Sequence, residues 1–309
     1  MGAVSLASAG LLPAMLPYHD TVGIPLAESL KKSEEARDFD GSRIVNGNLA
    51  RLGAHPYMVG LVIEIRGSAN SVCGSSMLSN TRSLTAAHCW FDGVRQALSF
   101  TMAFGTITVF TGGVRVRTTN VRMHENWDPR NLINDIAVIT HNRVGYTNAI
   151  QAITLPSGSL LNNNFVGTSA QVSGYGRTGD GSQHNIRPDQ AKRVATVRVI
   201  TNNECRNVFG SMVRDTIICT SGAEGRNICG SDSGGPLSIV NNNRRVLYLT
   251  AGGGLALLLV LLTFLGAVSL ASAGLLLQPM RCPYIRYGWV PLAEKSSKKS
   301  EEAEDFDGS

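Results

Sequence analysis

The segment CGSDSGGPL, from Cys229 to Leu237, contains the residues on which the interpretation of the whole chain depends. Its Ser-Gly-Gly run predicts a tight turn, because glycine adopts backbone conformations that other residues avoid. Two segments upstream also place a polar residue beside apolar ones: SLTAAHCW (Ser83–Trp90) and NDIAVI (Asn134–Ile139). Together the three segments supply a serine, a histidine and an aspartate, the residue types used in nucleophilic catalysis by a hydroxyl group.

The chemistry explains why these three residue types are needed together. A serine hydroxyl is a poor nucleophile until a neighbouring imidazole takes its proton, and a buried carboxylate must hold that imidazole in one tautomer. Taken singly, each residue has a simpler explanation: a histidine beside a disulfide, a solvated aspartate in a turn, and a Ser-Gly-Gly turn. Three such segments in one chain make coincidence the weaker interpretation.

In their order and approximate spacing, the three segments resemble the chymotrypsin-like serine proteases of the trypsin family, especially insect digestive enzymes. The resemblance covers residues 43–250, and it implies an all-β fold of two packed antiparallel six-stranded barrels. It also implies that Ser233 attacks the substrate, that His88 is the general base and that Asp135 orients His88. Two backbone amides, those of Ser231 and Ser233, are expected to form the oxyanion hole.

Composition agrees with this fold class. The 33 glycines and short alternating runs favour a turn-rich β protein, and a length of 309 residues suits either two domains or one all-β unit. The net charge of +5 comes from scattered arginines without an aromatic run, which argues against nucleic-acid binding. Because guanidinium stays protonated at high pH, the preference for arginine suggests an alkaline environment.

No cofactor or metal site is expected. The pattern Gly174, Gly176 and Gly179 fits GxGxxG, but a loop follows it where a dinucleotide site requires a helix. The remaining histidines lack the spacing of metal ligands, and we expect them at the surface. They are His55, His124, His141 and His184.

The cysteines predict disulfides and an oxidising compartment. There is no CxxC pair, so a zinc ribbon or thioredoxin-like motif is excluded. The resemblance pairs Cys73 with Cys89 and Cys205 with Cys219. No cysteine stands where the family places the partner of Cys229, and Cys282 also has no assigned partner. The expected location is extracellular, with the gut lumen as the implied site.

The resemblance further implies a zymogen. RIVNG begins at Arg43, and cleavage after Arg43 would free the ammonium group of Ile44 to pair with Asp232. Asn227 stands where trypsins have the aspartate of the primary specificity pocket. A neutral side chain there offers no ion pair to a substrate Arg or Lys. We therefore expect a preference for large apolar or aromatic residues, and activation by a separate trypsin-like protease.

Composition divides the chain into four parts. Residues 1–16 are expected to be a truncated leader, 17–43 a propeptide and 44–250 the protease domain, followed by 251–309. Residues 251–309 repeat one segment of the leader and one of the propeptide. The leader segment GAVSLASAGLL recurs at Gly266, and the propeptide segment KKSEEARDFDGS recurs as KKSEEAEDFDGS.

Three interpretations of residues 251–309 remain open. The favoured one is a gene model that joins two tandem copies, because only this explains the repeated leader and propeptide. The others are a membrane anchor at 252–278, which the apolar run permits, and a divergent end of the second barrel. If the family's last strands are missing, the second barrel is incomplete and leaves an open sheet edge.

The sequence as a whole predicts a secreted, monomeric serine endopeptidase that acts on protein or peptide substrates and is open to protein protease inhibitors. Two alternatives are kept: a catalytically inactive homologue that lacks the substrate-binding wall, and a membrane-tethered protease. Covalent labelling of Ser233 by a fluorophosphonate after activation separates an enzyme from an inactive homologue, because the reaction needs an assembled oxyanion hole.

Overall fold

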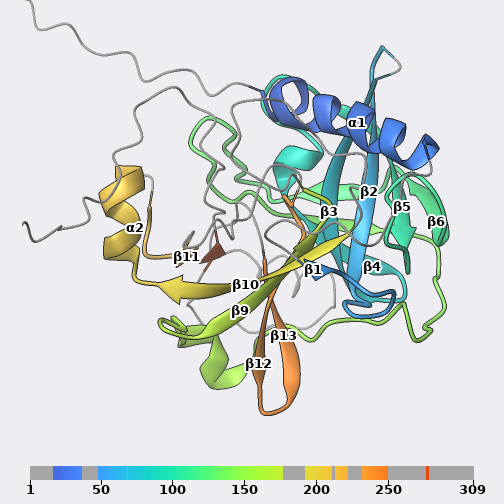
Figure 1. Cartoon of the computed structure of the whole chain (residues 1–309). Coiled ribbons are helices and arrows are strands. Elements are labelled where there is room, and N and C mark those ends of the chain that lie inside the picture. The colour runs from blue at the N-terminus through green and yellow to red at the C-terminus, as the bar shows by residue number, and fades with distance from the viewer. Residues whose placement is uncertain are drawn as a thin grey trace, which may run out of the picture.

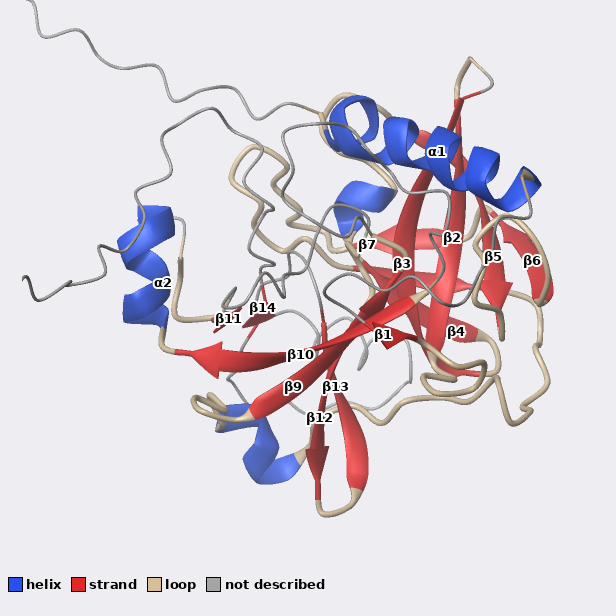
Figure 2. Ribbon diagram, in the orientation of Figure 1, coloured by secondary structure: helices blue, strands red, loops and turns tan. Residues whose placement is uncertain are grey.

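A computed structural model describes residues 17–36, 48–67, 69–176, 192–210, 213–221, 232–249 and 276–277. The strands among these residues are arranged in two curled sheets that pack together (Figure 1; Figure 2). The strands are β1 (Asn48–Leu49), β2 (Met58–Ile65), β3 (Ala69–Ser79), β4 (Arg82–Thr85), β5 (Ala97–Phe104), β6 (Val114–Thr118), β7 (Val121–Met123), β8 (Ala137–Thr140), β9 (Ser169–Gly174), β10 (Arg193–Ile200), β11 (Ile217–Thr220), β12 (Pro236–Asn241), β13 (Arg244–Leu249) and β14 (Leu276–Leu277).

The first sheet has the order β6-β5-β2-β3-β4-β8-β7 and is antiparallel throughout. Strand β2, MVGLVIEI, shows how its sequence builds the core. Successive side chains of a strand point to opposite faces. Val59, Leu61, Ile63 and Ile65 therefore share the inner face and are fully buried in the core of this sheet. Met58 and Val62 point the other way, so this strand is apolar on both faces and needs a cover on each.

The second sheet has the order β13-β12-β9-β10-β11-β14, with β1 added on β10. All of its pairs are antiparallel except β11 with β14. The expected fold class, all-β with two antiparallel sheets, is confirmed. The expected number of strands, six per barrel, differs from the structure, because each described sheet contains seven strands.

Two α-helices of the described residues accompany the sheets. α2 (Asn202–Phe209) begins with a capping box between Thr201 and Glu204, and the Cys205–Cys219 disulfide fastens it to β11. α1 (Ile24–Glu35) follows a wide helical turn (His19–Gly23) and lies across the first sheet over β2 and β3 (Figure 1). In the described part of the chain, no helix is long and apolar enough to cross a membrane.

Glycines allow the two sheets to approach each other closely. A Cβ on Gly74 of β3 would lie 2.7 Å from the Cα of Gly235, in the turn before β12. A Cβ on Gly234, whose φ is +77°, would lie 2.2 Å from Oγ1 of Thr85. Because neither glycine has a side chain, the turn that carries Ser233 can rest directly on the first sheet.

Candidate active site

His88 lies on a short 3-10 turn (Ala87–Cys89) that follows β4. Asp135 lies just before β8, and β8 pairs with β4, so the sheet brings these two residues together. One oxygen of Asp135, Oδ1, accepts the backbone N–H of His88 at 2.7 Å. The other, Oδ2, lies 2.6 Å from Nδ1 of His88. Both side chains are buried. This two-point contact fixes the imidazole and leaves Nε2 as the ring nitrogen that Asp135 does not contact.

Ser233 reaches this pair from the second sheet. Its carbonyl oxygen accepts the N–H of Gly74 at 2.7 Å and lies 3.9 Å from Sγ of Cys89, the residue after His88. The side chain of Ser233 is also buried, and Nε2 of His88 has no hydrogen-bond partner among the described residues. His88 and Asp135 are therefore in direct contact, and the backbone of Ser233 lies beside Cys89, the residue after His88, where the two sheets meet.

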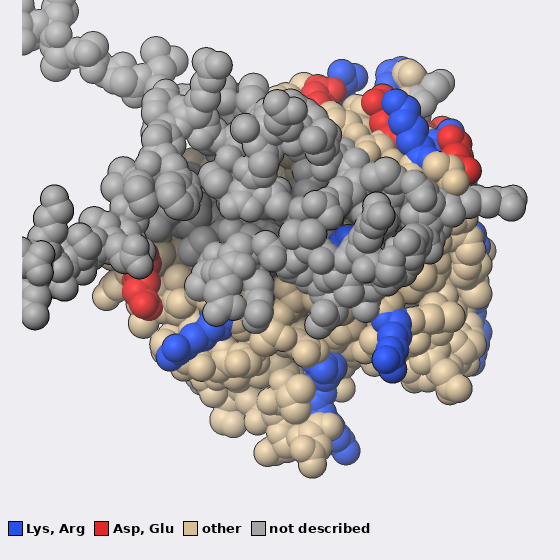
Figure 3. Space-filling view, in the orientation of Figure 1, with Lys and Arg blue, Asp and Glu red and all other residues tan. Residues whose placement is uncertain are grey.

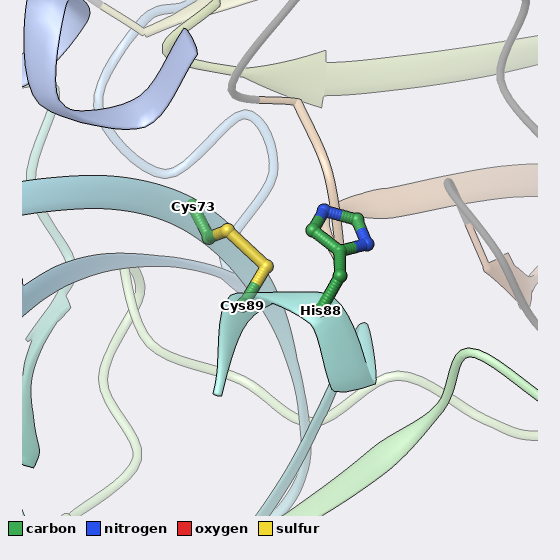
Figure 4. A group of neighbouring side chains, drawn as sticks. All are labelled: Cys73, His88 and Cys89. Atoms are coloured by element: carbon green, nitrogen blue, oxygen red, sulfur yellow. A yellow bond between two sulfur atoms is a disulfide. The ribbon is translucent and has the colours of Figure 1, made fainter. Parts of the chain in front are cut away.

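The Cys73–Cys89 disulfide stands beside His88 on the same turn (Figure 4). The ligand atoms of Cys73, Cys89 and His88 lie within 4.8 Å of one another, a grouping that resembles a metal site. Metal binding by cysteine needs a thiolate, and both sulfurs are used in the bridge. The group is therefore a disulfide next to a histidine. Both disulfides expected from the sequence, this one and Cys205–Cys219, are present.

Asp232, the residue before the candidate nucleophile, lies against the GYG segment of β9 and its end. The N–H of Gly176 donates to Oδ1 of Asp232 at 3.0 Å. A Cβ on Gly174 would lie only 1.8 Å from the same oxygen. Gly174 and Gly176 thus make room for the carboxylate of Asp232. Six other candidate residues lie outside the described residues: Arg43, Ile44, Asn227, Cys229, Ser231 and Cys282. The proposed anchor at 252–278, apart from 276–277, also lies outside them.

Three histidines that we expected at the surface are buried. His55 bonds to the hydroxyl of Tyr57, and His141 bonds to Ser83. Nδ1 of His124 accepts the N–H of Asn126. Burial lowers the pKa of each of the three, and that of His55 falls to about 4. The prediction failed because a histidine spaced unlike a metal ligand can still be a core residue with a hydrogen-bond partner. His184 lies outside the described residues.

Sequence reasoning also missed a contact to His88. The ring of Tyr18, from the segment before α1, packs on the imidazole with a centroid distance of 4.6 Å. Its hydroxyl donates to the carbonyl oxygen of Val72 at 2.8 Å. The segment around Tyr18 was interpreted only as a polar, charged propeptide, so nothing placed it at the site.

Charged side chains of both signs are visible on one face of the described residues (Figure 3). On the face shown in Figure 3, the Lys and Arg side chains of the described residues are dispersed, and several stand next to acidic ones. Among the described residues, Arg117 forms an ion pair with Glu64 at 2.6 Å.

Comparison with known proteins agrees with this geometry. The family model described as Trypsin matches residues 44–253. A collagenase of Hypoderma lineatum is 34% identical over 208 residues, which are 65% of this chain and 74% of that protein. Trypsin beta of Drosophila erecta is 34% identical over 203 residues, or 64% of this chain and 74% of that protein. The solved structure of HL collagenase matches with a TM-score of 0.61 and 28% identity, covering 73% of this chain and all of that one.

Fold, site and relatives define the class of this protein as a serine-type endopeptidase, a hydrolase. The chain belongs to the trypsin family.

Proposed function

We propose that the chain cleaves peptide bonds with Ser233 as nucleophile, His88 as general acid and base, and Asp135 as the group that orients His88. The observation that carries the proposal is the two-point contact of Asp135 with His88, beside the turn of Ser233, in a chain of the trypsin family. A carboxylate held on Nδ1 favours the tautomer whose Nε2 can accept a proton.

In the proposed reaction, Oγ of Ser233 attacks the carbonyl carbon of the scissile bond while its proton passes to Nε2 of His88. The resulting oxyanion is stabilised by the backbone amides of Ser231 and Ser233. When the tetrahedral intermediate collapses, Nε2 returns the proton to the leaving amine and an acyl-enzyme remains. Water, deprotonated by the same nitrogen, then hydrolyses the ester and restores Ser233.

The chain is proposed to be made as a zymogen. Cleavage after Arg43 would release the ammonium of Ile44, which pairs with the carboxylate of Asp232 and orders the oxyanion hole. The hydrogen bond from Gly176 to Asp232 supports this role, because it holds that carboxylate beside the candidate nucleophile. The two disulfides support secretion, since such bridges persist in oxidising compartments.

The proposed substrate preference is chymotrypsin-like, for a large apolar or aromatic residue before the cleaved bond. It rests on Asn227, which cannot form an ion pair with a substrate Arg or Lys. The zymogen would then depend on a separate trypsin-like protease for cleavage after Arg43.

The test combines labelling with substrate hydrolysis. The full chain, before and after treatment with trypsin, is exposed to a fluorophosphonate probe. Labelling of Ser233 is expected only after cleavage and should be absent from the S233A and H88A variants. Hydrolysis is then compared between peptide substrates that differ only in Phe or Arg before the cleaved bond. A cleaved chain that takes no label would refute the catalytic proposal, and preference for the Arg substrate would refute the assigned specificity.

A further inference from the structure

The segment of residues 17–36 is seated on the protease domain like a bound ligand. Three of its apolar side chains, Leu26, Ala27 and Leu30, are at most 1% exposed. They pack on a patch formed by four residues of the domain, namely Met58, Val72, Val109 and Tyr175. This patch includes the outer face of β2, the face that its sequence leaves apolar. The helix therefore covers a hydrophobic surface that the two sheets do not bury themselves.

Polar contacts fix the segment at its C-terminal end. The carboxylate of Glu34 accepts the backbone N–H groups of Val109 at 2.7 Å and of Phe110 at 3.0 Å, as well as the hydroxyl of Thr111 at 2.8 Å. Buried donors such as these N–H groups need a partner, and the carboxylate supplies one for each. Glu34 is itself buried. The helix thus has a defined position along the sheet.

The N-terminal end is fixed next to the catalytic histidine. The backbone N–H of His19 donates to Oδ2 of Asp92 at 2.9 Å, and Nδ1 of His19 lies 2.9 Å from Oγ of Ser71. Gly23 fits against the same serine, since a Cβ there would lie 1.9 Å from its Oγ. These contacts hold Tyr18, whose ring packs on His88 and whose hydroxyl also lies 3.5 Å from Sγ of Cys73. The space beside the imidazole is therefore filled by the chain's own segment.

Nothing covalent would retain this segment once the chain is cut after Arg43, because residues 1–43 contain no cysteine. Its hold on the domain would then depend on the contacts above and on its concentration.

We propose that residues 17–36 form an inhibitory segment that binds on the apolar patch over β2 and β3, packs Tyr18 on His88, and inhibits the mature protease even as a separate peptide. The proposal rests on the proposed function of the site. The protease would then be kept inactive in two ways. One is the uncut bond after Arg43, and the other is the segment that occupies the space beside His88.

The chain contains a natural comparison peptide. Aligned without a gap from Pro17, the repeat at Pro283 keeps the tyrosine, as Tyr284, and Pro-Leu-Ala-Glu further on. It replaces two residues that contact the domain: Gly23 corresponds to Trp289, and Leu30 corresponds to Ser296. A tryptophan at the position of Gly23 would collide with Ser71. A peptide of residues 283–303 is therefore expected to bind much more weakly than one of residues 17–36.

The experiment adds synthetic peptides to the full chain after trypsin cleavage and removal of the released segment. Hydrolysis of a small chromogenic substrate is measured at increasing concentrations of peptide 17–36, of its Y18A and G23W variants, and of peptide 283–303. In parallel, binding of fluorescently labelled peptides to the cleaved S233A chain is measured by anisotropy. This second measurement needs no activity, so failure of the inhibition proposal and failure of the proposed function give different results.

Peptide 17–36 is expected to bind and to inhibit with a rise in KM. The G23W peptide and peptide 283–303 should lose both effects. The Y18A peptide should keep most of its binding through the helix, yet inhibit at least about tenfold less, because the ring on His88 is gone. The proposal is overturned if peptide 17–36 does not bind to the S233A chain, if it binds without slowing hydrolysis, or if peptide 283–303 inhibits equally well.

Discussion

At the scale of single residues, Asp135 uses both carboxylate oxygens on His88, one on the backbone N–H and one on Nδ1. Replacing it by asparagine keeps the shape but removes the charge, and its amide can present a donor to Nδ1. The imidazole would then favour the tautomer with the proton on Nε2, which cannot accept the proton of Ser233. We expect kcat of the cleaved D135N chain to fall about 10⁴-fold, the size of this effect in the Ser–His–Asp template.

The measurement is kcat for a small peptide substrate, with far-UV circular dichroism to verify the fold. A D135N chain that folds and retains kcat within about tenfold of the unchanged chain would contradict the role given to Asp135.

Gly234 allows a test of how the sheets are joined. Its φ of +77° disfavours any side chain, and a Cβ would lie 2.5 Å from the carbonyl oxygen of Gly74. Gly67 has a similar φ of +94° but no atom within 4 Å of its Cβ position. Both alanine variants bear the backbone strain, about 1 kcal/mol, whereas only Gly234→Ala also forces the sheets apart.

We therefore expect G67A to lower the free energy of unfolding by about 1 kcal/mol and G234A by about 3 kcal/mol or more. Urea unfolding in the S233A background, which prevents self-digestion, measures both. Equal losses in the two variants would show that the glycine contact between the sheets contributes nothing.

That the three candidate segments lie close together was predictable, because the chemistry proposed for them constrains sequence locally. His88, Asp135 and Ser233 each stand in a short recognisable segment, and the structure brings these segments together. The buried positions of His55 and His141 were not predictable. Their partners, Tyr57 for one and Ser83 for the other, are ordinary side chains whose spacing carries no signal of a hydrogen bond.

At the scale of elements, α1 is what the sequence analysis overlooked. Segment 17–43 was interpreted by its charges, KKSEEAR, although Leu26, Leu30 and Glu34 recur every four residues and predict one face of a helix. Pro25 near the start of the helix is a further signal. The sequence could not predict the surface on which α1 packs, because that apolar patch is assembled from β2, β3 and residues distant from them in the sequence.

The docking of α1 is expected to depend on pH through His19. Burial is the main cause that lowers the pKa of His19 to about 4. Of its charged neighbours, Asp92 and Asp20 favour the protonated form, whereas His88 and Arg95 oppose it. Once the segment is released, His19 regains its ordinary pKa of about 6.5. Between these values the free segment takes up a proton that the bound segment excludes, so binding is complete above pH 6.5 and weakens as the pH falls towards 4.

Affinity of peptide 17–36 for the cleaved S233A chain should therefore fall between pH 7.5 and pH 5, by at most about tenfold per pH unit below pH 6.5. The matched H19Q peptide cannot titrate at this position and should show a flatter profile. Anisotropy titrations at several pH values compare the two. Parallel profiles would contradict a role of His19 and assign the pH dependence to other groups.

At the scale of the whole molecule, the two-sheet architecture followed from a family resemblance carried by a few short segments. The number of strands did not follow: the first described sheet has seven strands, and the second reaches seven only with β1 and β14, two-residue strands defined by their partners. Such short elements form when neighbouring backbone groups are already in place, which local sequence does not encode.

The arginine-rich composition suggested an alkaline environment, and one buried group predicts stability in the same direction. Lys192 is 1% exposed, and burial lowers its pKa to about 8. Above pH 8 the folded chain releases this proton, while the unfolded chain keeps it up to about pH 10.5. The unfolded state thus binds more protons in that range, and the free energy of unfolding rises with pH, by up to about 3 kcal/mol from this group.

Tyrosines set the upper end of this range. Burial raises the pKa of Tyr175 and of Tyr248, so above about pH 10 only the unfolded chain ionises these phenols and stability falls again. A stability maximum between pH 9 and pH 10 is therefore the expected outcome of urea unfolding on the S233A chain. The matched K192M variant keeps both tyrosines but loses the rise from pH 8. If the two chains instead show parallel profiles over this range, Lys192 is not the source of the alkaline stability.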